Sequence, residues 1–213
     1  MVSTFARLTA GLVLLPAICA VAQAAEPVRV LDGFDDPSTW RVVTSNQVSG
    51  ALRSVAGVEG KGLCLDYDFN GVSGHAGIQR DLVLEYPANY QFAFQLRGDS
   101  PRNDLQFKLI DASGDNVWWV NRPKYDFPTA WTPVRYKMRH IDKAWGPDPD
   151  RVLRRSVKLE YTVYNNAGGK GSVCFDQLTF QPLSVDDGAP LTGKASANAA
   201  FPAGAAPLAP CPT

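Results

Sequence analysis

The sequence predicts an all-β protein, an antiparallel two-sheet β-sandwich, and three observations lead to this fold class. Apolar side chains alternate with polar ones at a period of two in several runs, as in Tyr90 to Arg97. Clusters of Gly, Asn, Asp, Ser and Pro separate these runs, for example at 56–62 and 165–169. No segment keeps an apolar period of 3.6 residues for three turns. Strands with one polar face each are typical of two packed antiparallel sheets.

Nine strands are expected, taken here in chain order. Four show clear alternation, and five are apolar runs bounded by turn residues. The expected strands cover residues 28–34, 62–69, 76–84, 90–97, 105–110, 116–121, 134–139, 158–163 and 172–180.

The composition indicates one globular domain and excludes several partners. The chain has 213 residues, 45% of them hydrophobic, and 21 Lys and Arg residues balance 21 Asp and Glu residues. A net charge of zero argues against nucleic acid or an anionic membrane as a partner, because both select a basic excess. All the aromatic residues except Phe5 and Phe201 lie between Phe34 and Phe180, which places the packed domain at about 27–183.

The first 24 residues have the pattern of a secretory signal peptide. Arg7 is followed by the apolar run Leu8 to Ala22 and by a small-x-small cleavage site that ends at Ala24. The run is too short for a comfortable membrane span. A lipoprotein that uses Cys19 is the alternative, although Ile18 is larger than the usual preceding residue. We expect a secreted or periplasmic protein.

The last segment, 184–213, is rich in Ala and Pro and has Phe201 as its one aromatic residue. It has too little apolar surface to offset the entropy of ordering, so we expect a disordered tail or a linker.

Export favours a disulfide between Cys64 and Cys174, since both lie in expected strands and secreted proteins keep such bonds oxidised. The alternative is two unpaired, half-buried thiols. Cys211 lies in the expected tail.

Two groups of side chains are candidates for ligand binding. The first is the polar face of the strands, where long amide and cationic groups suit sugar hydroxyls. Its members are Gln91, Gln95, Arg97, Gln106, Lys108, Arg135, Lys137 and Arg139. They form one site only if their strands are neighbours. The alternative is an ordinary solvated face.

The second group consists of aromatic residues that could stack on pyranose rings. Trp118 and Trp119 are adjacent on one strand and so point to opposite faces; the alternation makes Trp118 the exposed ring. Trp145 and Tyr125 lie in segments flanked by Pro. The alternative role for each ring is to cap the end of the sandwich.

Several short motifs resemble one family of modules. They include Phe34-Asp35-Asp36, Gly60-Lys61-Gly62-Leu63, Phe92 to Gly98, Leu105 to Asp111 and Gly171 to Leu178. The chain is similar, over about residues 28–183, to galactose-binding-like jelly-roll carbohydrate-binding modules of the family 4 and family 11 kind. This resemblance implies a jelly roll in an exported, non-catalytic module that binds a polysaccharide or oligosaccharide beside a linked or partner glycan-active enzyme.

The resemblance also implies a structural calcium ion where the first strand, an early Gly-rich turn and the last strand meet. Residue by residue, it assigns Asp35, the carbonyl of Lys61 and Asp176 as ligands. The alternative is turn chemistry for each Asp.

No catalytic motif is present in the sequence. Two alternatives to a binding module stay open. One is a jelly-roll polysaccharide lyase that uses His75, Tyr136 and Arg139, and the other is a purely structural module of the same fold.

Overall fold

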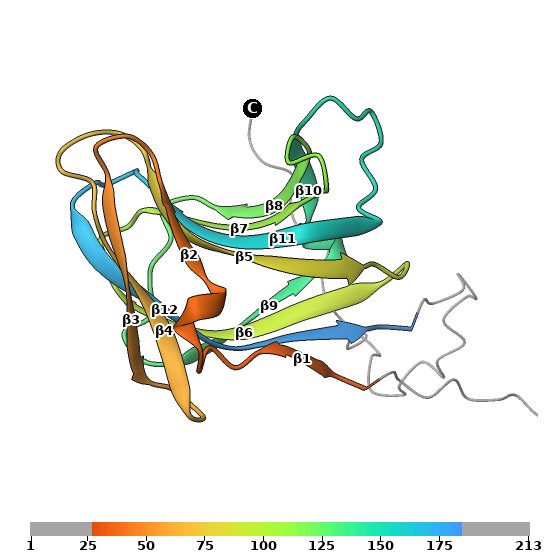
Figure 1. The fold of residues 1–213 in the computed structure, drawn as a ribbon, viewed down its shortest axis with the longest axis horizontal. Coiled ribbons are helices and arrows are strands. Elements are labelled where there is room, and N and C mark those ends of the chain that lie inside the picture. The colour runs from red at the N-terminus through yellow and green to blue at the C-terminus, as the bar shows by residue number, and fades with distance from the viewer. Residues whose placement is uncertain (1–26, 185–213) are drawn as a thin grey trace, which may run out of the picture.

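The computed structural model describes residues 27–184, which form two six-stranded antiparallel sheets packed face to face (Figure 1). Sheet A has the order β3-β4-β12-β6-β9, with β1 beside the second half of β12. Its strands are β1 (Arg29–Asp32), β3 (Ser49–Ala56), β4 (Lys61–Asp68), β6 (Tyr90–Asp99), β9 (Thr132–Lys137) and β12 (Lys170–Pro182).

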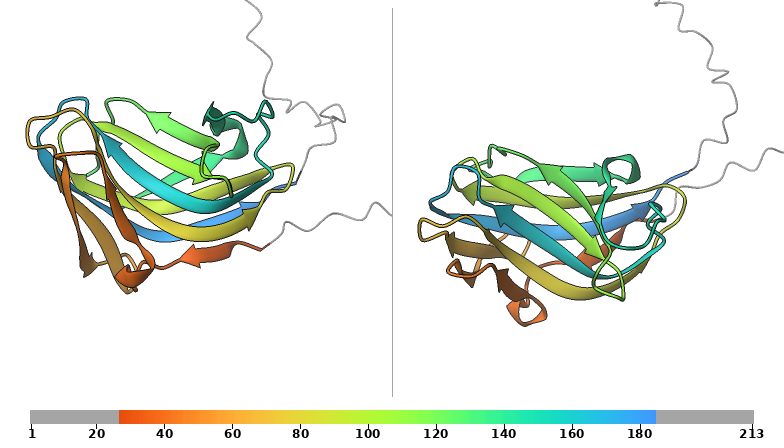
Figure 2. Two further views of the ribbon diagram at one scale, coloured as in Figure 1. Left: turned by 45° about the horizontal axis from the view of Figure 1, so that its top comes forward. Right: turned by 90° about the horizontal axis from the view of Figure 1, so that it is seen from above.

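Sheet B has the order β10-β8-β7-β11-β5-β2. Its strands are β2 (Arg41–Thr44), β5 (His75–Glu85), β7 (Asp104–Ile110), β8 (Val117–Arg122), β10 (Asp142–Trp145) and β11 (Arg155–Tyr164). Two short 3₁₀ helices, η1 (Pro37–Thr39) and η2 (Met138–His140), lie before β2 and after β9. Figure 2 shows that the two sheets bend in the same sense, so the outer face of sheet B is concave and that of sheet A is convex.

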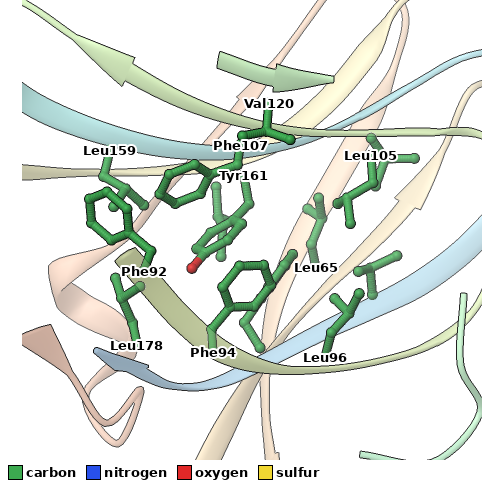
Figure 3. Close-up of a cluster of buried hydrophobic side chains, with 14 of the residues drawn as sticks. Leu65, Phe92, Phe94, Leu96, Leu105, Phe107, Val120, Leu159, Tyr161 and Leu178 are labelled. Atoms are coloured by element: carbon green, nitrogen blue, oxygen red, sulfur yellow. The ribbon is translucent and has the colours of Figure 1, made fainter. Parts of the chain in front are cut away.

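The core fills the space between the sheets and is rich in aromatic rings (Figure 3). Phe92 and Phe94 of β6 meet Phe107 of β7 and Tyr161 of β11, with ring centroids 5.0 to 6.2 Å apart. The residues on either side of them in sequence point outward, because side chains alternate along a strand. The period-two pattern therefore comes from this aromatic layer.

The predicted fold class is confirmed, and each of the nine expected strands is present within residues 27–184. The sequence pattern missed β2, β3 and β10. Strands β2 and β10 have four residues each, and β3 consists largely of small residues with no buried member. Such strands are held by their partners in the sheet and carry little alternation of their own.

The expected disulfide is present. Cys64 of β4 lies directly opposite Cys174 of β12, and the bond joins residues 110 positions apart. The expected signal peptide, 1–24, and the expected tail, including Cys211, lie outside the described residues, apart from residue 184. Within residues 27–184, no helix is long and apolar enough to cross a membrane.

Candidate functional site

The polar strand residues fall on two opposite faces, so the single site expected from them does not form. Gln91, Gln95 and Arg97 belong to β6, and Arg135 and Lys137 to β9, both in sheet A. Gln106 and Lys108 belong to β7 in sheet B. Alternation along a strand shows that a side chain points outward, but it does not show which sheet the strand joins.

On sheet B, one row of outward residues crosses all six strands. The strand register places Lys108 between Glu160 of β11 and Trp119 of β8. The complete row is Arg41, Gln79, Glu160, Lys108, Trp119 and Asp142. This row and the neighbouring outward residues make up what we call the concave face. The neighbouring residues are Gln106, Thr162, His75, Tyr164 and Trp145.

A buried ion pair lies at the centre of this row. The Nζ atom of Lys108 is 2.9 Å from Oε1 of Glu160, and both side chains are at most 10% exposed. Thr162 and Gln79 also donate to the Glu160 carboxylate, each at 2.6 Å. Burial alone would raise the pKa of Glu160, but the charge of Lys108 and these hydrogen bonds outweigh it and hold the pKa below its usual value. The carboxylate is therefore ionised and fixed in place.

An exposed aromatic ring stands beside the ion pair. Trp145 of β10 is 49% exposed and meets Trp119 edge to face, with ring centroids 5.6 Å apart. The Nζ atom of Lys108 is 5.9 Å from the centroid of the Trp145 ring. An open ring next to fixed polar groups can stack on the apolar face of a sugar while those groups bond its hydroxyls.

The expected exposure of Trp118 is wrong. Trp118 lies opposite Leu109 of the core, is 4% exposed, and donates its indole N–H to the carbonyl of Arg151 at 2.8 Å. The misleading residue is Val117, which lies on the outer face yet is only 3% exposed, opposite Trp145. Because this Val is buried although it lies on the outer face, the alternation of apolar residues in β8 does not show which face points to the core.

Gln106 was predicted on the polar strand face, whereas several other residues of the concave face were missed. Gln106 is 6% exposed, and its side chain makes no hydrogen bond with any residue of 27–184. Tyr164, the last residue of β11, is 41% exposed. The partners Glu160, Thr162 and Gln79 were also missed. Glu160 and Thr162 appear in the alternation of β11, and Gln79 lies on β5. Only the strand register shows that the three gather at the Lys108–Glu160 pair.

Three other predicted binding residues lie away from the concave face. Arg97 belongs to sheet A, where its guanidinium lies 4.9 Å from the ring centroid of Trp131. Arg139 lies in η2, directly after β9 of sheet A. Tyr125 packs edge to face on Phe127, with ring centroids 5.1 Å apart, and contacts the core. Of the predicted residues, the fold brings Lys108, Trp145 and Gln106 together on the concave face.

The three groups expected to bind calcium do converge on the turn between β3 and β4. Asp35 accepts a hydrogen bond from the N–H of Lys61 at 2.8 Å, and Asp176 accepts from the N–H of Val58 at 2.6 Å. Asp176 is fully buried and has no cationic side chain as a partner within residues 27–184. A buried carboxylate is normally neutralised by a cation, so its charge fits a metal ion here. No group of three Asp, Glu, His or Cys side chains forms a site in this part of the chain, so carbonyls and water would have to complete the shell.

The residues named for a lyase do not meet. Tyr136 points into the core from β9 of sheet A and is 3% exposed. His75 lies on β5 of sheet B, on the outward side. Arg139 lies in η2, next to sheet A. His75 therefore lies on the outer face of sheet B, Tyr136 inside the sandwich and Arg139 beside sheet A, so the three side chains do not share a site.

No protein-family model matches the sequence, and no curated protein matches it. Solved structures do. One is a family 11 carbohydrate-binding module from Clostridium thermocellum in complex with a β-1,3-1,4-mixed-linked tetrasaccharide, with a TM-score of 0.60 and 17% identity over 74% of this chain and 96% of that chain. Another is the family 11 module of the cellulosomal cellulase Lic26A-Cel5E from the same organism, with a TM-score of 0.60 and 16% identity over 76% and 99% of the two chains. At such identities the likeness shows the fold, and it confirms the expected kind of β-sandwich.

Proposed function

We propose that the protein is a non-catalytic carbohydrate-binding module that holds a polysaccharide or oligosaccharide on its concave face. The observation that carries the proposal is the exposed Trp145 beside the buried Lys108–Glu160 pair. The ring offers a stacking surface, and the ion pair offers a fixed donor and acceptor that need no reordering when a sugar binds.

The rest of the concave face supports an extended ligand. Tyr164 and Trp145 are the exposed aromatic residues at its two ends. The strand register separates them by six residues along β7 and by three strand spacings, which is roughly 24 Å from standard strand geometry. Between these ends lies the amide of Gln106, which has no hydrogen-bond partner in the part of the chain that the structure describes. This arrangement suits an oligosaccharide or a polysaccharide segment better than a single sugar.

The proposal includes a location and a partner. The apolar N-terminal run and the Cys64–Cys174 bond support a secreted or periplasmic protein. A module of this kind would concentrate a linked or partner glycan-active enzyme near its substrate, and the linkage would add avidity to weak binding.

We also propose a structural calcium ion held by Asp35, the carbonyl of Lys61 and Asp176. The support is the convergence of these residues on one turn, and the burial of Asp176 without a cationic side chain as a partner within residues 27–184. A bound cation would add charge compensation and tie the first strand to the last.

The test is a binding and activity assay on a panel of soluble polysaccharides that includes a mixed-linked β-glucan. Retention of the full chain on one of them, without release of unsaturated products, is expected. Trp145→Ala should abolish the retention. Trp131→Ala is the matched control, because Trp131 lies on the convex face and is half-buried.

Three outcomes would contradict the proposal. Unsaturated products would favour a lyase, and no retention on any polysaccharide would favour a structural module. Retention that Trp145→Ala leaves intact would move the binding site away from the concave face. Melting curves of both variants show whether a loss of binding is a loss of folding.

A further inference from the structure

A hollow lies on the convex face of sheet A, on the opposite side of the molecule from the concave face. It has a volume of about 680 Å³, within the range of small-molecule sites. Its floor is formed by β6 and β12, and its walls are β9 on one side and the 33–35 and 59–60 loops on the other. A bulge in β12 between Asp176 and Thr179, where Gln177 has a φ of 50°, interrupts the ladder there.

The chemistry of the lining is divided between the two walls. Arg135 stands on the β9 wall, and its side chain makes no ion pair or hydrogen bond with any residue of 27–184. Asp35 and Glu59 stand on the opposite wall, where Asp35 accepts from the Lys61 N–H and Glu59 accepts from the Gln177 amide. The two carboxylates therefore already accept hydrogen bonds from neutral donors, whereas Arg135 has no anionic partner among residues 27–184.

The remaining lining residues offer amides and apolar carbon. The side chain of Gln95 also lacks a hydrogen-bond partner within the described residues, and Gln177 lies in the neighbouring β12, directly after Asp176, the residue paired with Gln95. Val30, Ala93 and Pro133 supply apolar surface, and Val30 is 72% exposed. A ligand for this hollow needs one anionic group for Arg135, hydroxyl donors for the carboxylates and amides, and a small apolar face.

We propose that this hollow is a second ligand site for a short acidic saccharide that contains a uronic acid. Its carboxylate would pair with Arg135, whose planar guanidinium suits bidentate contact with a carboxylate. Its hydroxyls would bond Gln95, Gln177 and Glu59. A dicarboxylate is disfavoured because Glu59 would repel its second charge. The concave face and this hollow lie on opposite sheets, so the two sites would bind independently.

The test compares two disaccharides that differ in one group, cellobiouronic acid and cellobiose, by calorimetric titration into the full chain. The acidic sugar should bind at least tenfold more tightly, and added salt should narrow the difference because the Arg135 contact is exposed. Arg135→Gln should weaken the acidic sugar by roughly tenfold, the scale of one charge-assisted hydrogen bond. Arg139→Gln is the control, since Arg139 is an exposed arginine beyond β9 that does not line the hollow.

Equal affinity for the two sugars, or unchanged binding in Arg135→Gln, would overturn the inference. A preference for free glycine, added as a zwitterionic probe, over the acidic sugar would overturn the class of ligand. Trp145→Ala separates this site from the proposed function. It should abolish retention on polysaccharide but leave the cellobiouronic acid titration intact, and a loss of both would place the acidic sugar on the concave face.

Discussion

The concave face of sheet B and the convex face of sheet A both carry charged side chains, but they hold them in different ways. At the centre of the concave face, Lys108, Glu160, Thr162 and Gln79 bond one another and are largely withdrawn from solvent. On the convex face, the ion pair of Arg53 with Asp66 is exposed, and Arg135 has no ion-pair partner within residues 27–184. The first arrangement is rigid before any ligand arrives, and the second is open to solvent.

The two faces are also fastened differently. A row across sheet A runs Arg53, Cys64, Cys174 and Arg97, so a covalent bond joins two strands of the convex face. The corresponding row on sheet B depends on a salt bridge and hydrogen bonds. Charge should therefore matter more for stability on the concave face than on the convex face.

Lys108→Met is the largest expected effect and tests this contrast directly. It leaves the Glu160 carboxylate buried without a cation, which typically costs about 3–5 kcal/mol of unfolding free energy. Urea unfolding at neutral pH measures the loss. The matched change on the convex face, Arg53→Met, removes an exposed partner and should cost about 0–1 kcal/mol. Similar costs for the two variants would remove the distinction between the faces.

Replacing both cysteines of the Cys64–Cys174 bond by Ala should lower the unfolding free energy by about 2–4 kcal/mol. The reason is that the bond closes a long loop and so restricts the unfolded chain. Urea unfolding of the double variant provides the measurement, and reduction of the unchanged protein is a second route to the same state. Retention on polysaccharide below the unfolding transition should persist, because the bond lies on the other sheet. If a folded double variant lost its retention on polysaccharide, the disulfide on the convex face would affect binding on the concave face.

The fold was predictable from the sequence because its aromatic core imposes a period of two on the longer strands. Phe92, Phe94 and Leu96 are all buried, and each alternates with an outward polar residue. Strand β10 was not predictable, since it has four residues and is held by pairing with β8. Local patterns report burial, but short edge strands depend on neighbours that are distant in sequence.

The candidate site was predictable in part, for Lys108, Gln106 and Trp145. Its other members depend on strand order. Glu160 follows Lys108 by 52 positions and meets it only because β11 pairs with β7. Likewise, Arg97 and Lys108 show the same outward pattern but lie on opposite faces. Nothing in one strand's alternation specifies the sheet to which the strand belongs.

Chelation tests the calcium proposal at the edge of the convex face. If an ion is bound at a hundred times its dissociation constant, removing it should cost about 2.7 kcal/mol and lower the melting temperature. Asp35→Asn should abolish the sensitivity to chelator, because the amide oxygen can still accept from Lys61 while the charge is lost. Equal melting with calcium and with chelator would show that Asp35 and Asp176 only bond the turn.

The smallest expected effect is a dependence of stability on pH that arises on the concave face. Burial, with a contribution from the charge of Lys108, lowers the pKa of His75 below its usual value of 6.5. The folded state therefore favours the neutral ring. The stability that this contributes is present above pH 6.5 and is lost as the pH falls through the lowered pKa of the folded state. The unfolding free energy should accordingly decrease between pH 7 and the mildly acidic range.

His75→Gln should flatten this pH dependence, whereas His140→Gln is the control. Burial and the charge of Arg139 also lower the pKa of His140, but its side chain lies on the surface in η2, where solvent screens the interaction. Urea unfolding of the three proteins at a series of pH values compares the slopes. Flattening by His140→Gln alone would place the titrating group beside sheet A and reverse the comparison. Flattening by His75→Gln alone would show that burial of His75 on the concave face, rather than a group in the exposed η2, makes the stability of the fold depend on pH.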